Sequence, residues 1–351
     1  MKMKVRKAVI PIAGLGTRHF PASHAVKKEM FPVVGPDGIA RALFHYHLLE
    51  LEAAGIEEIC IIVQPGEEEM VRDYLRGPGD AYLKRLEKYP ALLREAEQMR
   101  DFENRISFAV QSQQEGYGHA VFQTKNFGAG EMVLLALGDH LFRGKRLSRA
   151  AAVFAPSPRP GGERVGVRGF EFENKSASSP RPSPPLAMEE REKNPGLSAL
   201  SPYRELVDTA KICGGKSVSA VNRISADELK GYGTIAGMRR AENPRLIDIS
   251  LIIEKPSVAV AREQLRVDGL PAGTWLGWFG LHLLAPSIYD VLEEMIRDDV
   301  RDHGEFQLTR AQEIQRRREG YLALEMTGAE RFDFGVPDDF VRSVSAFRHS
   351  P

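Results

Sequence analysis

Glycines and cations gather near the start of this chain, directly after a short apolar run. The run Lys7–Ile12 contains β-branched residues, which predicts a strand buried on both faces. Ala13-Gly14-Leu15-Gly16-Thr17-Arg18 follows it, and Lys27 and Lys28 come a little further on. Glycines let the backbone turn amide hydrogens toward phosphate oxygens, while arginine and lysine supply positive charge. The stretch therefore predicts a nucleotide-phosphate site, and a tight turn that happens to carry an arginine is the alternative.

Two well-known glycine loops do not fit this stretch. A dinucleotide-binding loop requires a third glycine, and His19 occupies that position. Pro21 follows closely, which disfavours a helix that starts at Gly16. The stretch also lacks the Gly-Lys-Ser/Thr ending of a Walker loop. An oxidoreductase with a dinucleotide-binding fold is therefore disfavoured.

Two further polar residues come at the ends of predicted strands. Gln111 ends the alternating run from Ile106, and Asp139 follows the apolar run Met132–Leu137. Ligands of open α/β sheets bind outside the carboxyl ends of the strands, so we expect both residues on the same rim as the glycine stretch. A carboxylate there can hold a hard cation, since Mg²⁺ takes one or two carboxylates and completes its shell with phosphate oxygens and water. An aspartate that caps a turn or a helix is the alternative for Asp139.

The order of these motifs resembles that of the sugar-1-phosphate nucleotidyltransferases. Gly-x-Gly-Thr-Arg is followed by Pro21 and by Lys28-Glu29-Met30-x-Pro32, and Glu254-Lys255-Pro256 ends a predicted strand in the second half. The resemblance covers roughly residues 5–155 and 201–347, in the family's order. Members of the family usually carry proline before the signature lysine, where this chain has Lys27. The resemblance therefore assigns the signature role to Lys28 and leaves Lys27 undecided.

The resemblance implies a role for each matching residue. The implied catalytic residues are Arg18, Lys28 and Asp139. The implied nucleotide contacts are Ala13, Gly14, Gly16, Thr17, Gln111 and Gly116. The implied sugar-phosphate contacts are Gly233, Glu254 and Lys255. The implied metal ligands are Asp139 and Asp333.

Several of these roles have a chemical rationale and an open alternative. The Gln111 carboxamide offers both a donor and an acceptor, as the imide edge of uracil requires. Asp333, in Phe332-Asp333-Phe334-Gly335, could instead cap the final helix. Glu254 and Lys255 could form a simple ion pair on a loop. Arg310 replaces the aspartate that the family has after Gln-Leu-Thr, so Glu305 receives no role.

The fold that follows from these patterns is α/β, with a Rossmann-like mixed, mainly parallel sheet flanked by helices. Ala40–Ala54 has helical spacing and Glu58–Val63 is the next apolar strand, so the chain opens with a βαβ unit. The expected reaction is Mg²⁺-assisted transfer of UMP from UTP to glucose 1-phosphate. The alternatives are the same chemistry with dTTP or GTP and another sugar 1-phosphate, and a non-catalytic nucleotide-sugar binding protein.

Composition excludes several classes of partner. Lysine plus arginine equals aspartate plus glutamate at 48 each, so a nucleic-acid partner is not expected. No apolar run approaches the roughly 20 residues that span a bilayer, and no secretion signal is recognised, so we expect a cytoplasmic protein without a membrane partner. Cys60 and Cys213 lack metal-site spacing, and Cys60 is expected to be a reduced core thiol. A homo-oligomer is compatible with the sequence, which does not define the oligomeric state.

Residues 156–200 interrupt the regular pattern. They hold eight of the chain's 22 prolines together with many arginines and serines, and they show almost no apolar periodicity. Such a composition does not bury enough surface to offset the entropy of ordering. The sequence predicts a disordered insertion here, within a single domain made of residues 1–155 and 201–351. A proline-rich partner motif is the alternative.

Overall fold

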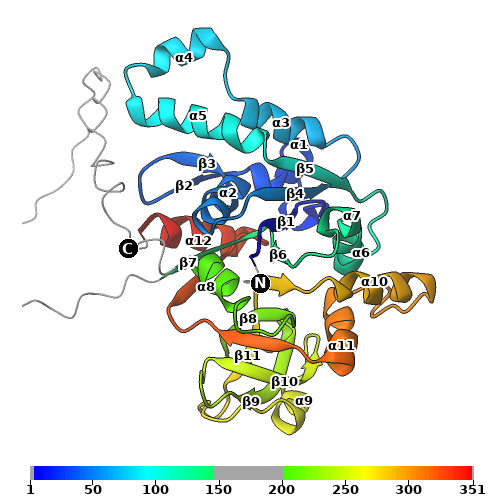
Figure 1. Ribbon diagram of the computed structural model, residues 1–351. Coiled ribbons are helices and arrows are strands. Elements are labelled where there is room, and N and C mark those ends of the chain that lie inside the picture. Colours follow the sequence, from blue (N-terminus) through cyan, green and yellow to red (C-terminus); the bar gives the residue numbers. More distant parts are fainter. Residues whose placement is uncertain (1–3, 145–200, 350–351) are drawn as a thin grey trace, which may run out of the picture.

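A computed structural model describes residues 4–144 and 201–349 (Figure 1). The predicted insertion at 156–200 lies outside the described residues. Strands from both sides of that segment share one sheet, because β6 (Val133–Ala136) pairs with β11 (Trp275–Leu284). The two halves of the chain therefore meet along this strand pair.

The described residues form a nine-stranded sheet with the strand order β5-β4-β1-β6-β11-β8-β12-β10-β9. Besides β6 and β11, its strands are β1 (Lys7–Pro11), β4 (Glu58–Val63), β5 (Ile106–Val110), β8 (Val218–Ile224), β9 (Thr234–Arg239), β10 (Leu246–Ile253) and β12 (Leu322–Glu325).

The prediction of a mixed sheet is confirmed, but parallel pairing is concentrated in one half. The neighbours β5, β4, β1 and β6 run parallel, and so do β8 and β12. The strand β11 returns antiparallel to both of its neighbours, and β10 is antiparallel to β12 and β9. The description "mainly parallel" therefore holds only for the β5-β4-β1-β6 half, because the second half of the chain turns back on itself.

Helices cover both faces of the sheet. The longer helices are α2 (Leu43–Ala53), α3 (Glu68–Arg76), α5 (Pro90–Glu103), α8 (Pro202–Thr209), α10 (Ser287–Arg297), α11 (Leu308–Glu319) and α12 (Pro337–His349). The shorter ones are α1 (Ala22–Ala25), α4 (Asp80–Leu86), α6 (Tyr117–Phe122), α7 (Lys125–Gly128) and α9 (Val258–Gln264). Helix α2 begins at Leu43 rather than at Ala40, because residues 40–42 form a strand first.

The strand β1 shows how the two faces are filled. Ala8 and Ile10 belong to a core cluster that includes side chains of α2 and α8. Val9 belongs to a second cluster, which includes side chains of α10 and α11. Successive side chains of a strand point to opposite faces, so β1 is buried on both sides, as its apolar run predicts.

Two small antiparallel sheets stand beside the main one. The pair β7 (His140–Gly144) and β13 (Ala329–Asp333) places Asp333 opposite His140. The pair β2 (Pro32–Val34) and β3 (Ala40–Ala42) lies between the glycine stretch and α2 in the sequence. The first of these pairs joins the end of β6 to a segment from near the end of the chain.

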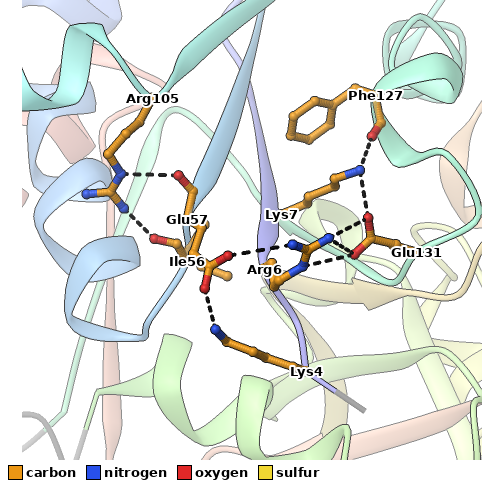
Figure 2. A network of polar contacts seen from close by, with 8 residues as sticks. All are labelled: Lys4, Arg6, Lys7, Ile56, Glu57, Arg105, Phe127 and Glu131. Carbon is orange, nitrogen blue, oxygen red and sulfur yellow. Dashed lines mark hydrogen bonds and ion pairs between the residues drawn. The ribbon is translucent and has the colours of Figure 1, made fainter.

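An ion-pair network holds the amino end of β1 (Figure 2). Lys7 Nζ lies 2.8 Å from a carboxylate oxygen of Glu131 and donates to the Phe127 carbonyl at 3.0 Å. Arg6 pairs with the same carboxylate at 3.0 Å, and Lys4 pairs with Glu57. These partly exposed contacts each contribute little, but together they tie β1 to its neighbours. The glycine stretch follows the opposite, carboxyl end of β1.

Two smaller expectations concern the cysteines and the membrane. Cys60 and Cys213 are free, buried thiols, as expected for Cys60, and burial raises the pKa of the Cys60 thiol to about 12. Within residues 4–144 and 201–349, no helix is long and apolar enough to cross a bilayer.

Candidate active site

The glycine stretch leaves β1 as an open loop rather than as an α-helix. Gly16 has a φ of +65°, a conformation that favours glycine, and a single 3₁₀ turn follows over Thr17–His19. Ala13 is buried, and the Gly14 carbonyl accepts a hydrogen bond from Gln64 Nε2 at 3.4 Å. A side chain at Gly14 would meet no atom within 4 Å. The exclusion of a dinucleotide-type helix start is therefore confirmed.

Lys28 and Asp139 form a buried ion pair at the carboxyl ends of the central strands. Nζ lies 2.7 Å from Oδ2, and the two side chains are only 10% and 12% exposed. Burial lowers the pKa of Lys28, but Asp139 and Glu29 outweigh burial, so that the pKa is raised overall. Burial raises the pKa of Asp139, but His140 and Lys28 hold it well below its usual value. Both groups are therefore charged at neutral pH.

The side chain of Asp139 binds other side chains and does not cap a helix. Its Oδ1 lies 2.8 Å from His140 Nδ1, and its backbone carbonyl accepts from the Phe334 amide at 2.9 Å. His140 Nε2 in turn lies 3.3 Å from Asp333 Oδ2. Burial lowers the pKa of His140, but Asp139 and Asp333 raise it overall. Lys28, Asp139, His140 and Asp333 thus form one continuous chain of charges.

Asp333 is the last residue of β13, directly before the turn that leads to α12. Its Oδ1 accepts from the Gly335 amide at 2.7 Å, two residues before α12 begins at Pro337. Burial raises the pKa of Asp333, but His140 lowers it overall. The contact with Gly335 shapes this turn, and the other oxygen faces His140. The carboxylate is therefore shared between the turn and the charged chain.

Gly335 marks the point where these charges converge. A Cβ at this position would lie 3.0 Å from Asp333 Oδ1, 3.1 Å from Asp139 Oδ2 and 3.5 Å from Arg18 Nη2. Only glycine leaves this space free. Two carboxylates and the guanidinium of the glycine loop therefore border one small gap. In the part of the chain that the structure describes, no group of three or more His, Cys, Asp or Glu side chains could hold a metal ion.

Glu29 is a site residue that the sequence does not single out. Its side chain is 2% exposed, and Oε2 has no hydrogen-bond partner. Oε1 lies 3.6 Å from Lys28 Nζ. Burial raises the pKa of Glu29 to about 7, although Lys28 opposes this shift. The group therefore titrates near neutral pH beside the Lys28–Asp139 pair.

Lys27 has a different partner from its neighbour. Its Nζ lies 2.7 Å and 2.8 Å from the two carboxylate oxygens of Glu67. Glu67 also accepts from the Gln64 amide at 2.9 Å. Lys27 therefore fastens the loop before α3, whereas Lys28 faces Asp139.

Gln111 and Gly116 belong to one loop after β5. Gln111 is buried, and its Nε2 donates to the Gly116 carbonyl at 3.1 Å. Gly116 has a φ of +111°, and a Cβ there would lie 2.8 Å from Glu305 Cβ and 2.9 Å from the Phe306 carbonyl oxygen. The loop thus packs against the segment that leads into α11. The Gln111 amino group is turned toward its own loop.

Gly233 and Glu254 line a cavity of about 140 Å³ in the second half of the molecule. A Cβ at Gly233 would lie 2.5 Å from Trp278 Nε1 and 2.9 Å from Glu254 Oε2, so the glycine makes room for both. His140 lines the same cavity, which therefore opens beside Asp139. Lys255 does not line it; its side chain is exposed and lies 3.5 Å from Glu254, with a backbone φ of +46°.

The structure thus brings together Arg18, Lys28, Asp139 and Asp333, and separately Gly233 and Glu254. His140 joins the two groups, and its position directly after Asp139 is the sequence signal that identifies it. Tyr117, Trp278, Gln312 and Arg331 also line the cavity. No sequence pattern marks them: Trp278 lies within an apolar run, and Arg331 lies in a short charged strand.

Comparison with known proteins gives a consistent result. A sequence model of the family "Nucleotidyl transferase" matches residues 7–168. UTP–glucose-1-phosphate uridylyltransferase 1 of Staphylococcus saprophyticus is 27% identical over 346 residues, which cover 98% of this chain and 93% of that protein. The UTP–glucose-1-phosphate uridylyltransferase of Mycoplasma pneumoniae is 25% identical, with 97% of this chain and 91% of that protein covered.

Solved structures share the fold at lower identity. UDP-glucose pyrophosphorylase complexed with UDP-glucose superposes with a TM-score of 0.65 at 20% identity and covers 98% of both chains. UTP-bound UGPase from Acinetobacter baumannii gives a TM-score of 0.66 at 21% identity, covering 98% of this chain and 93% of that one. The fold is therefore the mixed α/β fold of nucleotidyltransferases. The chain is thus similar to nucleotidyl transferases over residues 7–168, and to UTP–glucose-1-phosphate uridylyltransferases over nearly its whole length.

Proposed function

We propose that this protein transfers UMP from UTP to glucose 1-phosphate, giving UDP-glucose and pyrophosphate. The observation that carries the proposal is the position of the Lys28–Asp139 pair. Arg18 of the glycine loop and Asp139 both lie next to Gly335, and His140, which contacts Asp139, lines the cavity with Glu254. The names of the relatives that align over nearly the whole chain support the same reaction.

The reaction needs positioning and charge neutralisation more than a covalent nucleophile. A phosphate oxygen of glucose 1-phosphate attacks the α-phosphorus of UTP. The bond to the bridging oxygen of the departing pyrophosphate breaks in line with this attack, and that oxygen keeps the electron pair. Arg18 and Lys28 are the cations that would face the triphosphate and stabilise the leaving group. Lys28 suits this role because its neighbouring carboxylates keep it charged although it is buried.

We infer that a magnesium ion binds next to Gly335. Asp139 and Asp333 would hold it, since one oxygen from each carboxylate borders this space. Because the described residues offer no third acidic or histidine ligand, phosphate oxygens and water would complete the shell, which is the usual pattern for Mg²⁺. When bound, the ion would neutralise charge on the phosphate oxygens. Arg18 borders the same gap and would act on the same phosphates.

The remaining residues divide between the two substrates. The loop residues Ala13, Gly14, Gly16 and Thr17 are assigned to the triphosphate, and Gln111 and Gly116 to the base. Glu254 and Gly233 are assigned to the sugar, because they line the cavity. Lys255 is assigned to the sugar phosphate; its side chain is exposed and lies 3.5 Å from Glu254, which lines the cavity.

A matrix of substrates tests the proposal. Pyrophosphate release is measured with each nucleoside triphosphate against a set of sugar 1-phosphates, with and without Mg²⁺. We expect the highest kcat/KM for UTP with glucose 1-phosphate, and activity only with the metal. A preference for dTTP or GTP with another sugar 1-phosphate would assign the protein to a related specificity. Tight binding of UDP-glucose without turnover of any pair would identify a non-catalytic sensor.

A further inference from the structure

Three residues that line the cavity beside Glu254 each have a buried polar atom with no partner among the described residues. Among the described residues, Trp278 Nε1, Gln312 Oε1 and Tyr117 Oη are buried and unpaired, and all three residues line the cavity. Trp278 is 7% exposed and Gln312 is 1% exposed. A buried polar group without a hydrogen bond is costly, so these atoms point to a ligand that satisfies them.

The amide of Gln312 is held in one orientation by a closed network. Its Nε2 donates to His282 Nδ1 at 3.1 Å and to Tyr321 Oη at 3.0 Å. Ser219 Oγ lies 2.6 Å from the same His282 nitrogen and 2.9 Å from Tyr321 Oη. Burial lowers the pKa of His282 to about 3, so the ring is neutral, and its Nδ1 accepts from the Gln312 amide nitrogen because that nitrogen only donates. The network therefore uses the Gln312 donors and leaves Oε1 as a free acceptor.

The backbone of Trp278 is also held in place by hydrogen bonds on both sides. Its amide donates to the Gly233 carbonyl at 2.8 Å, and its carbonyl accepts from Arg331 at 2.9 Å. The indole Nε1 and the Glu254 carboxylate border the same space at Gly233. An indole nitrogen is a donor only, so it needs an acceptor from the ligand.

A ligand hydroxyl group would suit both Trp278 Nε1 and Gln312 Oε1. A hydroxyl both donates and accepts, so it can serve the Trp278 donor and the Gln312 acceptor alike. A phosphate lacks the donor that Gln312 Oε1 requires. Arg331 of the lining is already engaged, because it donates to the Trp278 carbonyl and stacks 4.0 Å from the Tyr232 ring centroid. His140 of the lining is engaged as well, with Asp139 and Asp333.

We propose that Trp278 and Gln312 bind hydroxyl groups of the hexose ring and so determine which sugar 1-phosphate the protein accepts. The inference rests on the proposed function, since it assigns the sugar of that reaction to this cavity. Trp278 Nε1 donates a hydrogen bond to a sugar hydroxyl, and Gln312 Oε1 accepts one. The Glu254 carboxylate accepts from a further hydroxyl.

The two tryptophans of the chain provide a matched pair of variants. Trp278→Phe removes the unpaired N–H and keeps an aromatic ring. Trp275→Phe is the control, because Trp275 lies in the same strand and its Nε1 already donates to the Ala261 carbonyl at 3.1 Å. We expect Trp278→Phe to raise the KM for glucose 1-phosphate about 3- to 10-fold, as for one net hydrogen bond. The KM for UTP stays unchanged, and Trp275→Phe leaves both values near those of the wild type.

Deoxy analogues of glucose 1-phosphate identify the contact. For the analogue that lacks the hydroxyl bound by Trp278, the wild type and Trp278→Phe should have equal kcat/KM. Each single-tryptophan protein also reports binding by fluorescence. Trp275→Phe retains only Trp278, so its emission should change with UDP-glucose and not with UDP. This fluorescence measurement needs no turnover. It tests whether Trp278 contacts the sugar even if Trp278→Phe does not fold.

The outcomes separate this inference from the proposed function. A wild type that makes no UDP-glucose overturns the proposed function and, with it, the sugar assignment. A wild type that makes UDP-glucose while Trp278→Phe behaves like Trp275→Phe overturns the inference alone. An equal loss in Trp278→Phe for glucose 1-phosphate and for every deoxy analogue also overturns it, because no hydroxyl would then depend on the indole.

Discussion

Replacing Asp139 with asparagine should separate two consequences of one buried carboxylate. The change removes the negative charge 2.7 Å from Lys28 Nζ and weakens the contact with His140. Lys28 is then left with Glu29 at 3.6 Å, a carboxyl whose pKa burial raises to about 7. Breaking a buried ion pair from one side costs about 3–5 kcal/mol. The two side chains are still 10% and 12% exposed, so water can partly solvate the charge that remains. We therefore expect Asp139→Asn to lower the free energy of unfolding by about 3 kcal/mol, the lower end of that range.

The same change should also remove most of the activity, for a different reason. A neutral amide is a poor ligand for a hard cation. We expect the rate of UMP transfer to fall by a factor on the order of 10² or more, as when a group that stabilises developing charge is lost. Urea unfolding in EDTA measures stability without the metal, and pyrophosphate release at saturating Mg²⁺ measures activity.

A double-mutant cycle distinguishes the ion pair from general damage. Lys28→Met alone should destabilise the protein, since it leaves Asp139 with His140 as its remaining partner. The double variant removes both charges, so its loss of stability should be clearly smaller than the sum of the single losses. Its activity should stay as low as that of Asp139→Asn.

Glu131→Gln is the matched control for losing a carboxylate with cationic partners. Glu131 pairs with Arg6 and Lys7 at the opposite end of β1 (Figure 2), and its side chain is 34% exposed. We expect a cost below about 1 kcal/mol and unchanged activity. Additive losses in the double variant, or near-normal magnesium-dependent turnover of Asp139→Asn, would show that the pair does not act as described.

Three further changes test other parts of the molecule. Gln111→Leu should weaken UTP binding by about 1–3 kcal/mol in isothermal titration, and an unchanged Kd would place the base elsewhere. Glu29 has a pKa near 7 in the folded protein against 4.5 ordinarily, so wild-type stability should fall as pH rises between these values. In Glu29→Gln the free energy of unfolding should fall by about 3 kcal/mol less over this pH range, which urea unfolding at pH 5 and at pH 8 would measure. Joining Ala155 to Ser201 should leave a folded, active enzyme, because long loops add little closure entropy; lost activity at an unchanged melting temperature would make residues 156–200 functional.

The strands that the sequence predicts best are the continuous apolar runs. Glu58–Val63 has the predicted bounds, and β1 ends one residue before the predicted Ile12, because strands buried on both faces need uninterrupted apolar residues. Short strands such as β7 and β13 carry charged residues, and no local pattern predicts them. Their pairing depends on contacts between distant parts of the chain, which no local pattern records.

In the candidate site, too, some residues can be predicted from local sequence patterns and others depend on contacts between distant parts of the chain. The glycine loop, Lys28 and Asp139 are recognisable because their spacing along the chain is itself informative. That Asp333 meets His140 follows from the pairing of β7 with β13, so spacing does not reveal it. Trp278 is hidden differently, since it lies within an apolar run where a tryptophan reads as core. Only the missing partner of its Nε1 distinguishes it from Trp275.

The charged chain also explains how a buried site can be ready for an anionic substrate. Burial alone lowers the pKa of Lys28 and of His140 and raises the pKa of Asp139. Their charged neighbours reverse each of these shifts and so favour the ionised forms. The cations are therefore held in place in advance and need little reorganisation during the reaction, which is the condition under which fixed charges stabilise a transition state most. Asp139 both sustains the charge of Lys28 and borders the gap at Gly335, so stability and catalysis should depend on it through separate contacts.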